Sequence, residues 1–266
     1  MIFMHLVNLA QVSGGAFLAL AAVHSVTFAV GRRIGRYNVV DVAWGIGFVA
    51  IAAVAAIVGH GDPTRRWLLL ALVSVWGLRL SWHIQRKTAG KGEDPRYAEL
   101  LGDATVGQVL RKVFLLQASI TWFVSLPLQL SAVTGATPKP LIALTAVGMA
   151  IWLVGVTFEA VGDWQLKAFK SDPANRGAVM DRGLWAWTRH PNYFGDAAVW
   201  FGLWLITING GWAFAAVGSP LLMTYFLVYV TGARLTEKVM AGRPGFDGYQ
   251  ARTAFFFPRP PKSPDR

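Results

Sequence analysis

The sequence predicts an all-α integral membrane protein with about seven transmembrane helices. Hydrophobic residues make up 54% of its 266 residues and charged residues only 15%, whereas an average globular chain is about 25% charged. The apolar residues form runs close to the roughly 20 residues that a helix needs to cross a bilayer. The basic residues lie mainly in alternate loops between these runs, which is the pattern of a polytopic membrane protein.

Seven apolar runs are the expected spans. In chain order they are Phe3–Val30, Val39–Val58, Trp67–Ile84, Val113–Val133, Leu141–Val161, Ala197–Ile208 and Trp212–Thr231. Gly14 and Gly15 predict a close helix contact in the first span. The sixth span is short, so we expect its helix to begin earlier, at Pro191, where the proline ends any preceding helix. Residues 258–266, rich in proline and charge, are expected to be disordered.

The distribution of basic residues predicts the orientation. All 25 Lys and Arg residues fall in the tail and the loops of one side except Arg65, Arg66 and Lys139, on the other side, and Arg79, within the third span. The positive-inside rule then places the N-terminus outside and the C-terminus in the cytoplasm. The first residues lack a basic region and a small-residue cleavage site, so we interpret the first apolar run as a span and not as a removed signal.

Composition also limits the chemistry. The chain has no cysteine, which excludes disulfides, a thiolate nucleophile and Cys-ligated zinc. Its five histidines are scattered, so no metal site is expected. The net charge of +11 lies between apolar spans, which favours a membrane surface and a phosphate-bearing ligand over nucleic acid. The sequence does not indicate an oligomeric state.

Ionisable side chains inside spans are costly unless they are paired or face a polar cavity, so they mark candidate functional residues. Asp41 opens the second span, with Trp44 one turn further on. The others share helix faces near the basic ends of later spans: Arg79, His83 and Arg86; Glu159, Asp163, Lys167 and Lys170; Arg234, Glu237 and Lys238. One polar cavity open to the cytoplasm would satisfy them all. Mutual salt bridges that hold the bundle together are the alternative.

The segment Thr188–Asp196 places polar side chains between two apolar runs. They are those of Arg189, His190, Asn192, Tyr193 and Asp196, with Trp187 just before them. We interpret the segment as a site for an anionic, aromatic cofactor; an interfacial anchor is the alternative. The loop before it adds Lys167, Lys170, Asn175, Arg176 and Arg182, which suit phosphates or reflect the ordinary basicity of a cytoplasmic loop.

Two further segments have alternative interpretations. Lys91–Tyr97, with Arg96 and Tyr97, is expected either to cap a helix or to clamp a ligand. Gly45-Ile46-Gly47-Phe48-Val49-Ala50 matches the dinucleotide fingerprint, but that fingerprint works only between a strand and a helix. Within a span these small residues predict close helix packing instead.

The chain contains Arg189-His190-Pro191-Asn192-Tyr193-Phe194-Gly195-Asp196, with Gly183-Leu184-Trp185 before it and Arg234-Leu235-Thr236-Glu237-Lys238 after it. In these motifs it resembles the steroid 5-alpha-reductase family. Its bacterial branch also matches Asp41-Val42-Ala43-Trp44-Gly45 and Glu93-Asp94-Pro95-Arg96-Tyr97. Membrane sterol reductases and the isoprenylcysteine and phospholipid methyltransferases share the Arg-His-Pro-x-Tyr core, so the core alone leaves the reaction open.

The resemblance implies a single membrane-embedded reductase domain over 1–266, with 1–110 on the substrate side and 141–257 binding NADPH. It places Asn192 at the nicotinamide, Asp163 at the cofactor, and Lys170 and Arg234 near the phosphates, with Lys238 replacing a histidine. Arg79, Arg86, Arg96, Lys167 and Arg176 are added as cofactor ligands on chemical grounds. The remaining members of the expected cofactor site are Tyr97, Glu159, Asn175, Trp187, Arg189, His190, Tyr193, Asp196 and Glu237.

The implied reaction needs an acid that polarises the carbonyl of a 4-en-3-one. Asp41 matches the family's acidic residue on the second span, and we expect it to be protonated because burial disfavours a charged carboxylate. Trp44 beside it is expected to contact the substrate. The family's paired tyrosine falls near Trp76, which cannot donate a phenolic proton. Tyr37, one turn before Asp41, is the expected substitute.

Three functions follow, in order of preference. The first is an NADPH-dependent reductase of a steroid or another lipid enone, in a bacterial inner membrane with its site open to the cytoplasm. The second is a membrane methyltransferase that uses S-adenosylmethionine; it is less favoured because Thr236-Glu237-Lys238 offers one acid where that group shows two. The third, a transporter or lipid-binding protein, predicts inverted repeats, and none is found between the halves.

Overall fold

The computed structural model describes residues 2–261, without the side chains of Ile2, Gly211 and Trp212, and this part of the chain is helical with no strand. Of the tail expected to be disordered, residues 262–266 lie outside the described residues. The chain forms two compact units: residues 1–142 with 207–216, and residues 143–206 with 217–266. Each unit is described by itself.

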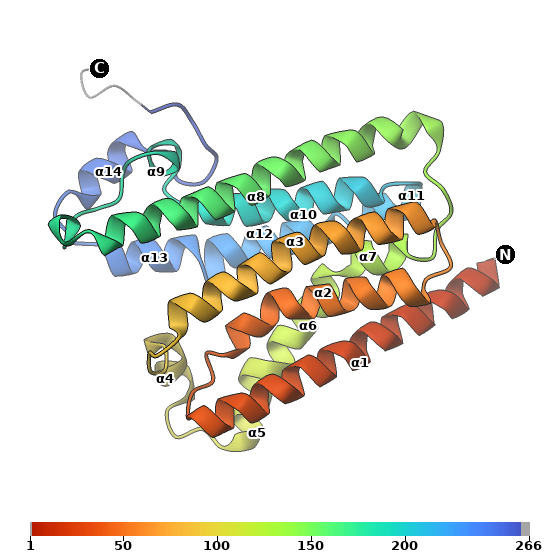
Figure 1. The fold of residues 1–266 in the computed structure, drawn as a ribbon, viewed down its shortest axis with the longest axis horizontal. Coiled ribbons are helices and arrows are strands. Elements are labelled where there is room, and N and C mark those ends of the chain that lie inside the picture. Colours follow the sequence, from red (N-terminus) through yellow and green to blue (C-terminus); the bar gives the residue numbers. More distant parts are fainter. Residues whose placement is uncertain (1, 262–266) are drawn as a thin grey trace. The chain divides into compact units, whose positions relative to one another are not determined.

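Unit 1 contains three long helices and a series of short ones (Figure 1). They are α1 (Ile2–Ile34), α2 (Val40–Val58), α3 (Pro63–Thr88), α4 (Pro95–Leu101), α5 (Val106–Val109), the π-helix η1 (Leu110–Leu115), α6 (Leu116–Val124), α7 (Leu126–Ser131), the 3₁₀-helix η2 (Lys139–Leu141) and α11 (Gly211–Ala215). Helix α2 lies between α1 and α3 and packs against both.

Unit 2 contains the remaining helices of the described chain. They are α8 (Ile142–Ser171), which begins at the unit boundary, η3 (Pro173–Asn175), α9 (Leu184–Trp187), α10 (Pro191–Thr207), α12 (Gly218–Tyr225), the π-helix η4 (Phe226–Val230), α13 (Ala233–Met240) and α14 (Phe246–Arg252). Helix α10 begins at Pro191, as expected for the short sixth span.

Five helical stretches of the described chain are long and apolar enough to cross a membrane: Phe3–Ile34, Val40–Val58, Pro63–Thr88, Lys139–Ser171 and Ala213–Met240. They overlap five of the seven expected spans. The expected fourth span is instead divided among the end of η1, α6 and α7, with a break at Ser125 before Pro127. The sixth coincides with α10, which has 17 residues. The count of seven therefore stays a prediction, as does the orientation.

Glycines let neighbouring helices approach closely. A Cβ atom on Gly45 of α2 would lie 2.1 Å from the carbonyl oxygen of Gly77 in α3, so no larger residue fits there. In unit 2, Gly155 of α8 and Gly195 of α10 face each other in the same way, as do Gly148 and Gly202. The packing interpretation of the Gly45 segment is confirmed, because small residues allow such contacts between membrane helices.

The close helix contact expected at Gly14 and Gly15 is present, and it lies at Gly15. A Cβ on Gly15 would lie 2.9 Å from Val54, whereas nothing lies within 4 Å of a Cβ on Gly14. The two adjacent residues point about 100° apart around the helix, so only one of them faces α2.

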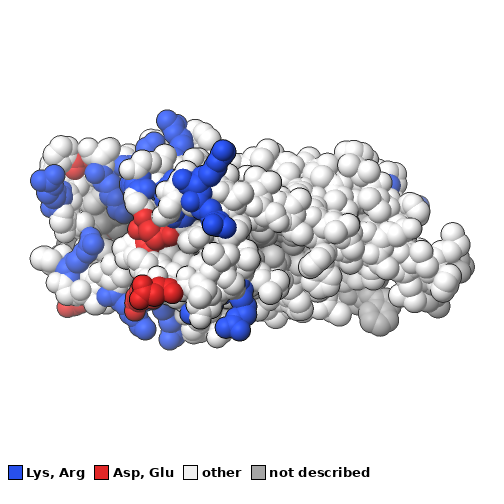
Figure 2. Space-filling model, turned by 90° about the horizontal axis from the view of Figure 1, so that it is seen from below, with Lys and Arg blue, Asp and Glu red and all other residues white. Residues whose placement is uncertain are grey.

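Charge gathers at one end of the face drawn in Figure 2, where Lys and Arg side chains surround a few carboxylates, and the rest of that face carries almost none. An uncharged surface of this kind suits contact with lipid. Arg65, expected on the sparsely charged side, is only 4% exposed. Its guanidinium donates hydrogen bonds to Ser131 Oγ at the end of α7, at 2.7 Å, and to Gly135 O in the loop that follows, at 2.8 Å. It therefore holds a loop in place instead of facing solvent.

Candidate functional site

A carboxyl–phenol pair lies in unit 1. Asp41, half-buried in the first turn of α2, accepts a hydrogen bond of 2.6 Å at Oδ1 from the hydroxyl of Tyr97 on α4. The side-chain amide of Gln117 on α6 donates to the same phenolic oxygen at 2.9 Å. Three residues from three helices therefore form a short hydrogen-bonded chain that ends at the carboxyl group.

The loop before α4 is fixed to the N-terminus of α2. The carboxylate of Glu93 accepts the backbone N–H groups of Tyr37 and Asn38, the latter at 2.9 Å. Asp94 caps α4 by accepting the N–H of Arg96 at 2.9 Å, and it also pairs with the Arg96 side chain. Carboxylates at helix N-termini satisfy free N–H groups and oppose the helix dipole. For Lys91–Tyr97, the helix-capping alternative is therefore the one the structure shows.

The electrostatics of this loop favour a neutral phenol. Burial, and then the nearby Asp41 carboxylate, raise the pKa of Tyr97. The hydrogen bond from Arg96 lowers the pKa of Asp94, and the same bond raises the pKa of Arg96. Tyr97 therefore keeps its proton at physiological pH and donates it in a hydrogen bond.

Tyr37 does not take the place expected for it. Its ring stacks on Phe28 at 6.0 Å between centroids and meets Phe114 edge-on at 6.2 Å. The one-turn spacing to Asp41 does not apply, because α1 ends at Ile34 and α2 begins only at Val40, so Tyr37 lies in the connection. Tyr97, expected at the cofactor, is the tyrosine that pairs with Asp41.

The two tryptophans expected near the substrate both contact Phe48 in the packing of α2. Trp76 is fully buried and lies 5.6 Å from the Phe48 ring, and half-buried Trp44 meets Phe48 edge-on at 5.5 Å. Of the expected cofactor cations, Arg79 is half-buried on α3, while exposed Arg86 lies 4.9 Å above the Trp82 ring. Arg79, Arg86, Arg96 and Tyr97 therefore belong to the unit of Asp41.

A carboxylate with three donors is the centre of the polar cluster in unit 2. Glu237 on α13 accepts from Arg189 Nε at 2.6 Å and contacts His190 Nε2 at 3.1 Å, both through Oε1. Gln250 of α14 donates to Oε2 at 3.0 Å. The side chains are 12% exposed for Arg189, 4% for His190 and 17% for Glu237. This pairing brings together three of the residues expected at the cofactor.

Backbone contacts fix this cluster in place. Arg189 donates its backbone N–H to Ala254 O at 2.9 Å and its Nη1 to Gln250 O and Thr253 O, which close the end of α14. The indole of Trp185 donates to Gly162 O in α8 at 3.0 Å. The segment 185–190 is thus held between α8 and the C-terminal residues. These contacts give hydrogen-bond partners to polar groups that burial would otherwise leave without one.

Burial decides the charge of the imidazole. It lowers the pKa of His190 to about 4, although the hydrogen bond to Glu237 acts in the opposite direction. Burial likewise raises the pKa of Tyr249, whose hydroxyl donates to Trp185 O at 2.6 Å. His190 is therefore neutral at pH 7, and the charge opposite Glu237 is that of Arg189.

Asn192 and Asp163, both assigned to the cofactor by resemblance, are neighbours in the structure. The amide of Asn192 on α10 donates to Asp163 Oδ1 on α8 at 3.3 Å, and both side chains are half-buried. Glu159 and Asp196 are buried on the same two helices. Tyr193 stacks against the His190 ring at 5.8 Å, so it connects this pair of helices to the Glu237 cluster.

The remaining expected residues of unit 2 lie at its surface. Lys167, Lys170, Arg176, Trp187, Arg234 and Lys238 are exposed. Arg234 lies 4.5 Å above the Tyr229 ring. Asn175 donates to Phe169 O at 3.0 Å near the end of α8, so its amide contacts the helix end.

Three residues of these clusters were not expected from the sequence. Gln117, Glu93 and Gln250 each complete a hydrogen-bonded group through partners more than ten residues away in the chain. Gln117 has a signal, since it is the only amide side chain in the apolar run from Val113 to Val124. Glu93 also has a signal, since it lies in the Lys91–Tyr97 segment and opens its Glu93-Asp94-Pro95-Arg96-Tyr97 motif. Gln250 lies in a polar segment where nothing in the sequence distinguishes it.

Comparison with known proteins shows the family. Residues 27–253 match the family described as protein of unknown function (DUF1295), and the chain belongs to this steroid 5-alpha-reductase-like family. The chain is also 23% identical over 239 residues to the uncharacterized protein C594.04c of Schizosaccharomyces pombe. That alignment covers 76% of this chain and 66% of the relative, just under two thirds of its length. No solved structure matches the chain.

Proposed function

We propose that the protein is an NADPH-dependent reductase of the carbon–carbon double bond of a lipid enone, such as a 4-en-3-one steroid. The observation that carries the proposal is the 2.6 Å pair of Tyr97 and Asp41. A carbonyl-polarising carboxylic acid with a paired tyrosine suits this reaction. Asp41 lies on α2, which is long and apolar enough to cross a membrane, so a hydrophobic substrate would reach it through the bilayer.

The direction of the hydrogen bonds supports different roles for the two side chains of the pair. The amide nitrogen of Gln117 can only donate, so the phenolic proton of Tyr97 is directed to Asp41 Oδ1. The acidic proton of Asp41 then resides on Oδ2 and can be donated to the substrate carbonyl. Asp41 gives this proton to the oxygen as the β-carbon is reduced, and it regains a proton when the enol takes one from water at its α-carbon and returns to the ketone. Such stabilisation of developing charge is typically the largest catalytic term.

The side chains of unit 2 fit the proposed cofactor. When bound, NADPH supplies the hydride from its nicotinamide C4. Asn192, oriented by Asp163, has the amide group needed to hold the carboxamide of the nicotinamide. Lys167, Lys170, Arg176, Arg234 and Lys238 present cations at the surface of the same unit, the kind of group that binds phosphates.

The methyltransferase alternative is less favoured by the same geometry. It depends on Glu237 as an acid near the sulfonium of S-adenosylmethionine. Glu237 is instead engaged by Arg189, His190 and Gln250, and the guanidinium of Arg189 compensates its charge. A carboxylate held in this way is a structural anchor for α13 and α14.

Ligand stabilisation of the detergent-purified protein tests the proposal. A ligand at about 100 times its Kd raises the free energy of unfolding by roughly 2.7 kcal/mol, which shifts the melting temperature measurably. We expect NADPH to raise it more than NADH and S-adenosylmethionine to leave it unchanged, and NADPH consumption to follow addition of a 4-en-3-one steroid. Stabilisation by S-adenosylmethionine with transfer of a labelled methyl group to a lipid would overturn the proposal.

A further inference from the structure

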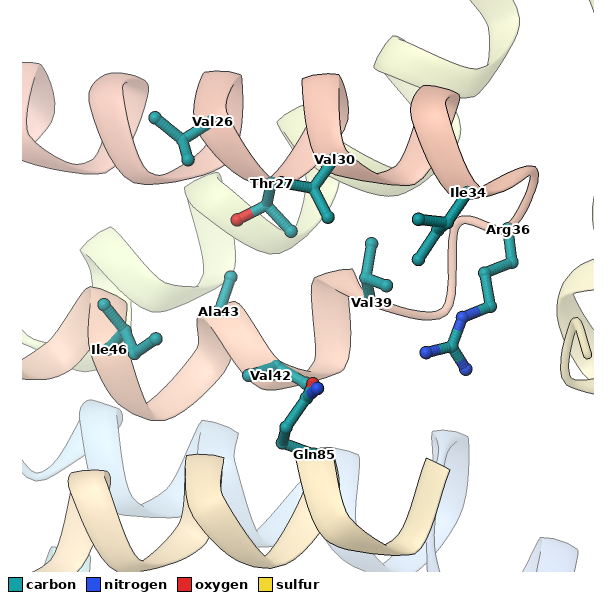
Figure 3. Close-up of a pocket in the computed structure, with 10 residues that line it drawn as sticks. All are labelled: Val26, Thr27, Val30, Ile34, Arg36, Val39, Val42, Ala43, Ile46 and Gln85. Atoms are coloured by element: carbon teal, nitrogen blue, oxygen red, sulfur yellow. The ribbon is translucent and has the colours of Figure 1, made fainter. Parts of the chain in front are cut away.

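An apolar groove between α1 and α2 lies apart from the carboxyl–phenol pair. Its walls are Val26, Val30 and Ile34 of α1 and Val42, Ala43 and Ile46 of α2, with Val39 and Thr27 between them (Figure 3). Asp41 is absent from the lining residues although both neighbouring turns contribute, because its side chain points towards Tyr97. The groove is therefore a second feature of unit 1 and does not depend on the proposed reaction.

The dimensions of the groove suit one hydrocarbon chain. From Val26 to Ile34, α1 rises about 12 Å at 1.5 Å per residue, close to the roughly 15 Å depth of one leaflet of a 30 Å hydrocarbon core. The groove has a volume of about 200 Å³, below the roughly 300–1,000 Å³ typical of pockets that enclose a drug-sized molecule. The wall residues Val26, Val30, Ile34 and Ile46 remain exposed, so the groove is open on one side. An acyl chain can therefore lie along the helices with its other side against the bilayer, whereas a ligand that must be enclosed would not be held.

The groove ends at a cation. Arg36 lines its end near the connection between α1 and α2, and Gln85 of α3 lines it beside Val42 (Figure 3). The Nη1 atom of Arg36 donates to Thr88 O at 2.7 Å and Lys91 O at 3.1 Å, which anchors the guanidinium over the end of α3. Within the described chain, the guanidinium makes no other hydrogen bond. A guanidinium carries five N–H donors, so the N–H groups of Nε and Nη2 can bind an anion.

We propose that this groove binds an anionic phospholipid of the bilayer, with one acyl chain along α1 and α2 and the headgroup phosphate on Arg36. The apolar walls match the acyl chain of such a lipid and the terminal cation matches its phosphate. The two features follow each other along the groove as the chain and the headgroup do in a leaflet. Basic pockets between transmembrane helices recognise anionic headgroups in this way, and a guanidinium suits the planar, multidentate contact with phosphate.

Matched variants test the site. Delipidated protein in detergent is titrated with phosphatidylglycerol or phosphatidylcholine of identical acyl chains, and the retained lipid is counted by native mass spectrometry. We expect wild type to retain one phosphatidylglycerol in preference to phosphatidylcholine. Arg36→Gln should weaken this binding about tenfold or more, the scale of a lost charge-assisted hydrogen bond. Arg33→Gln, an exposed cation that does not line the groove, should leave it unchanged.

The apolar walls are tested separately. Ile46→Trp fills the groove and should abolish retention, whereas Ile57→Trp, on the same helix but outside the groove and 71% exposed, should not. Arg36→Lys keeps the charge and should retain most of the preference, which guards against misfolding of Arg36→Gln. Equal losses in Arg36→Gln and Arg33→Gln would show general surface attraction, and undiminished binding to Ile46→Trp would show that the lipid lies elsewhere. Either result would overturn the proposal.

Discussion

A substitution can remove the acidic proton of Asp41 without changing the shape of its side chain. Asp41→Asn keeps the size of the side chain and an acceptor for the Tyr97 hydroxyl but removes the acidic proton. We expect enone reduction to fall by about 10²–10⁴-fold, the typical contribution of a general acid, while the NADPH-induced rise in melting temperature is unchanged. Steady-state rates with a 4-en-3-one steroid measure the first effect; an unimpaired rate would refute the role of Asp41.

The phenol of Tyr97 should matter less than the acid. Tyr97→Phe removes the hydrogen bond to Asp41 Oδ1, which would stabilise the carboxylate that Asp41 becomes when it gives up its proton. It should lower kcat roughly ten- to a hundredfold, the scale of one hydrogen bond to a charged group. Tyr37→Phe is the matched control, because it preserves the ring that stacks on Phe28 and should leave kcat unchanged. If Tyr37→Phe and Tyr97→Phe were equally impaired, the assignment of the paired tyrosine would be wrong.

His190 predicts how stability depends on pH. Burial lowers its pKa from 6.5 to about 4, so between these values the unfolded chain binds a proton that the folded chain does not. Stability should therefore fall as the pH decreases from about 6.5 to about 4, by up to about 1.4 kcal/mol per pH unit from this group, and should not respond to it above that range.

Melting temperatures between pH 7.5 and 4.5 measure this effect. His190→Gln retains a donor for Glu237 but has no proton to gain, so its melting temperature should fall less steeply over the same interval. Parallel curves for wild type and His190→Gln would show that His190 remains charged in the folded protein.

At the scale of the helices, the contact of α2 with α3 depends on a position where only glycine fits. A Cβ on Gly45 would overlap the backbone of Gly77 and the hydroxyl of Ser81, which itself bonds to Val42 O at 2.7 Å. We expect Gly45→Ala to destabilise the protein by roughly 1–3 kcal/mol, as overpacking does. Gly14→Ala, with open space around it, should be neutral or stabilising by up to about 1 kcal/mol. Thermal unfolding in one detergent compares the two.

The positions of continuous membrane helices could be predicted from the sequence, whereas interruptions within a helix could not. The apolar runs of α1, α2, α3 and α8 are continuous, and their predicted and observed positions overlap because length and hydropathy are local properties. The run 113–133 has the same composition, yet it is divided by a π-helix and by a break before Pro127. Such interruptions depend on what each turn packs against, which the run itself does not encode.

The candidate site shows the same limit at the scale of the whole molecule. Arg189, His190 and Glu237 were expected together and are in contact, since two of them are adjacent and the third lies in the polar stretch after a span. The partner of Asp41 was not expected, because Tyr97 is 56 residues further along the chain. Its position depends on the turn at Gly90, with φ of +71°, and on Glu93 holding the loop to α2. The spacing of residues along the sequence does not predict tertiary contacts of this kind.

The orientation of the whole chain is a prediction that the absence of cysteine makes simple to test. Single cysteines are introduced at exposed basic positions, Lys91→Cys and Lys238→Cys at the basic ends of the two units and Lys139→Cys in the connection expected outside. If the positive-inside rule holds, a membrane-impermeant maleimide added to intact cells labels only Lys139→Cys, and permeabilised cells show all three labelled. Because α1 and α3 run in the same direction through the unit, labelling of Lys91→Cys from outside would invert the topology. It would also place the Asp41–Tyr97 pair on the wrong side of the membrane for a cytoplasmic pool of NADPH.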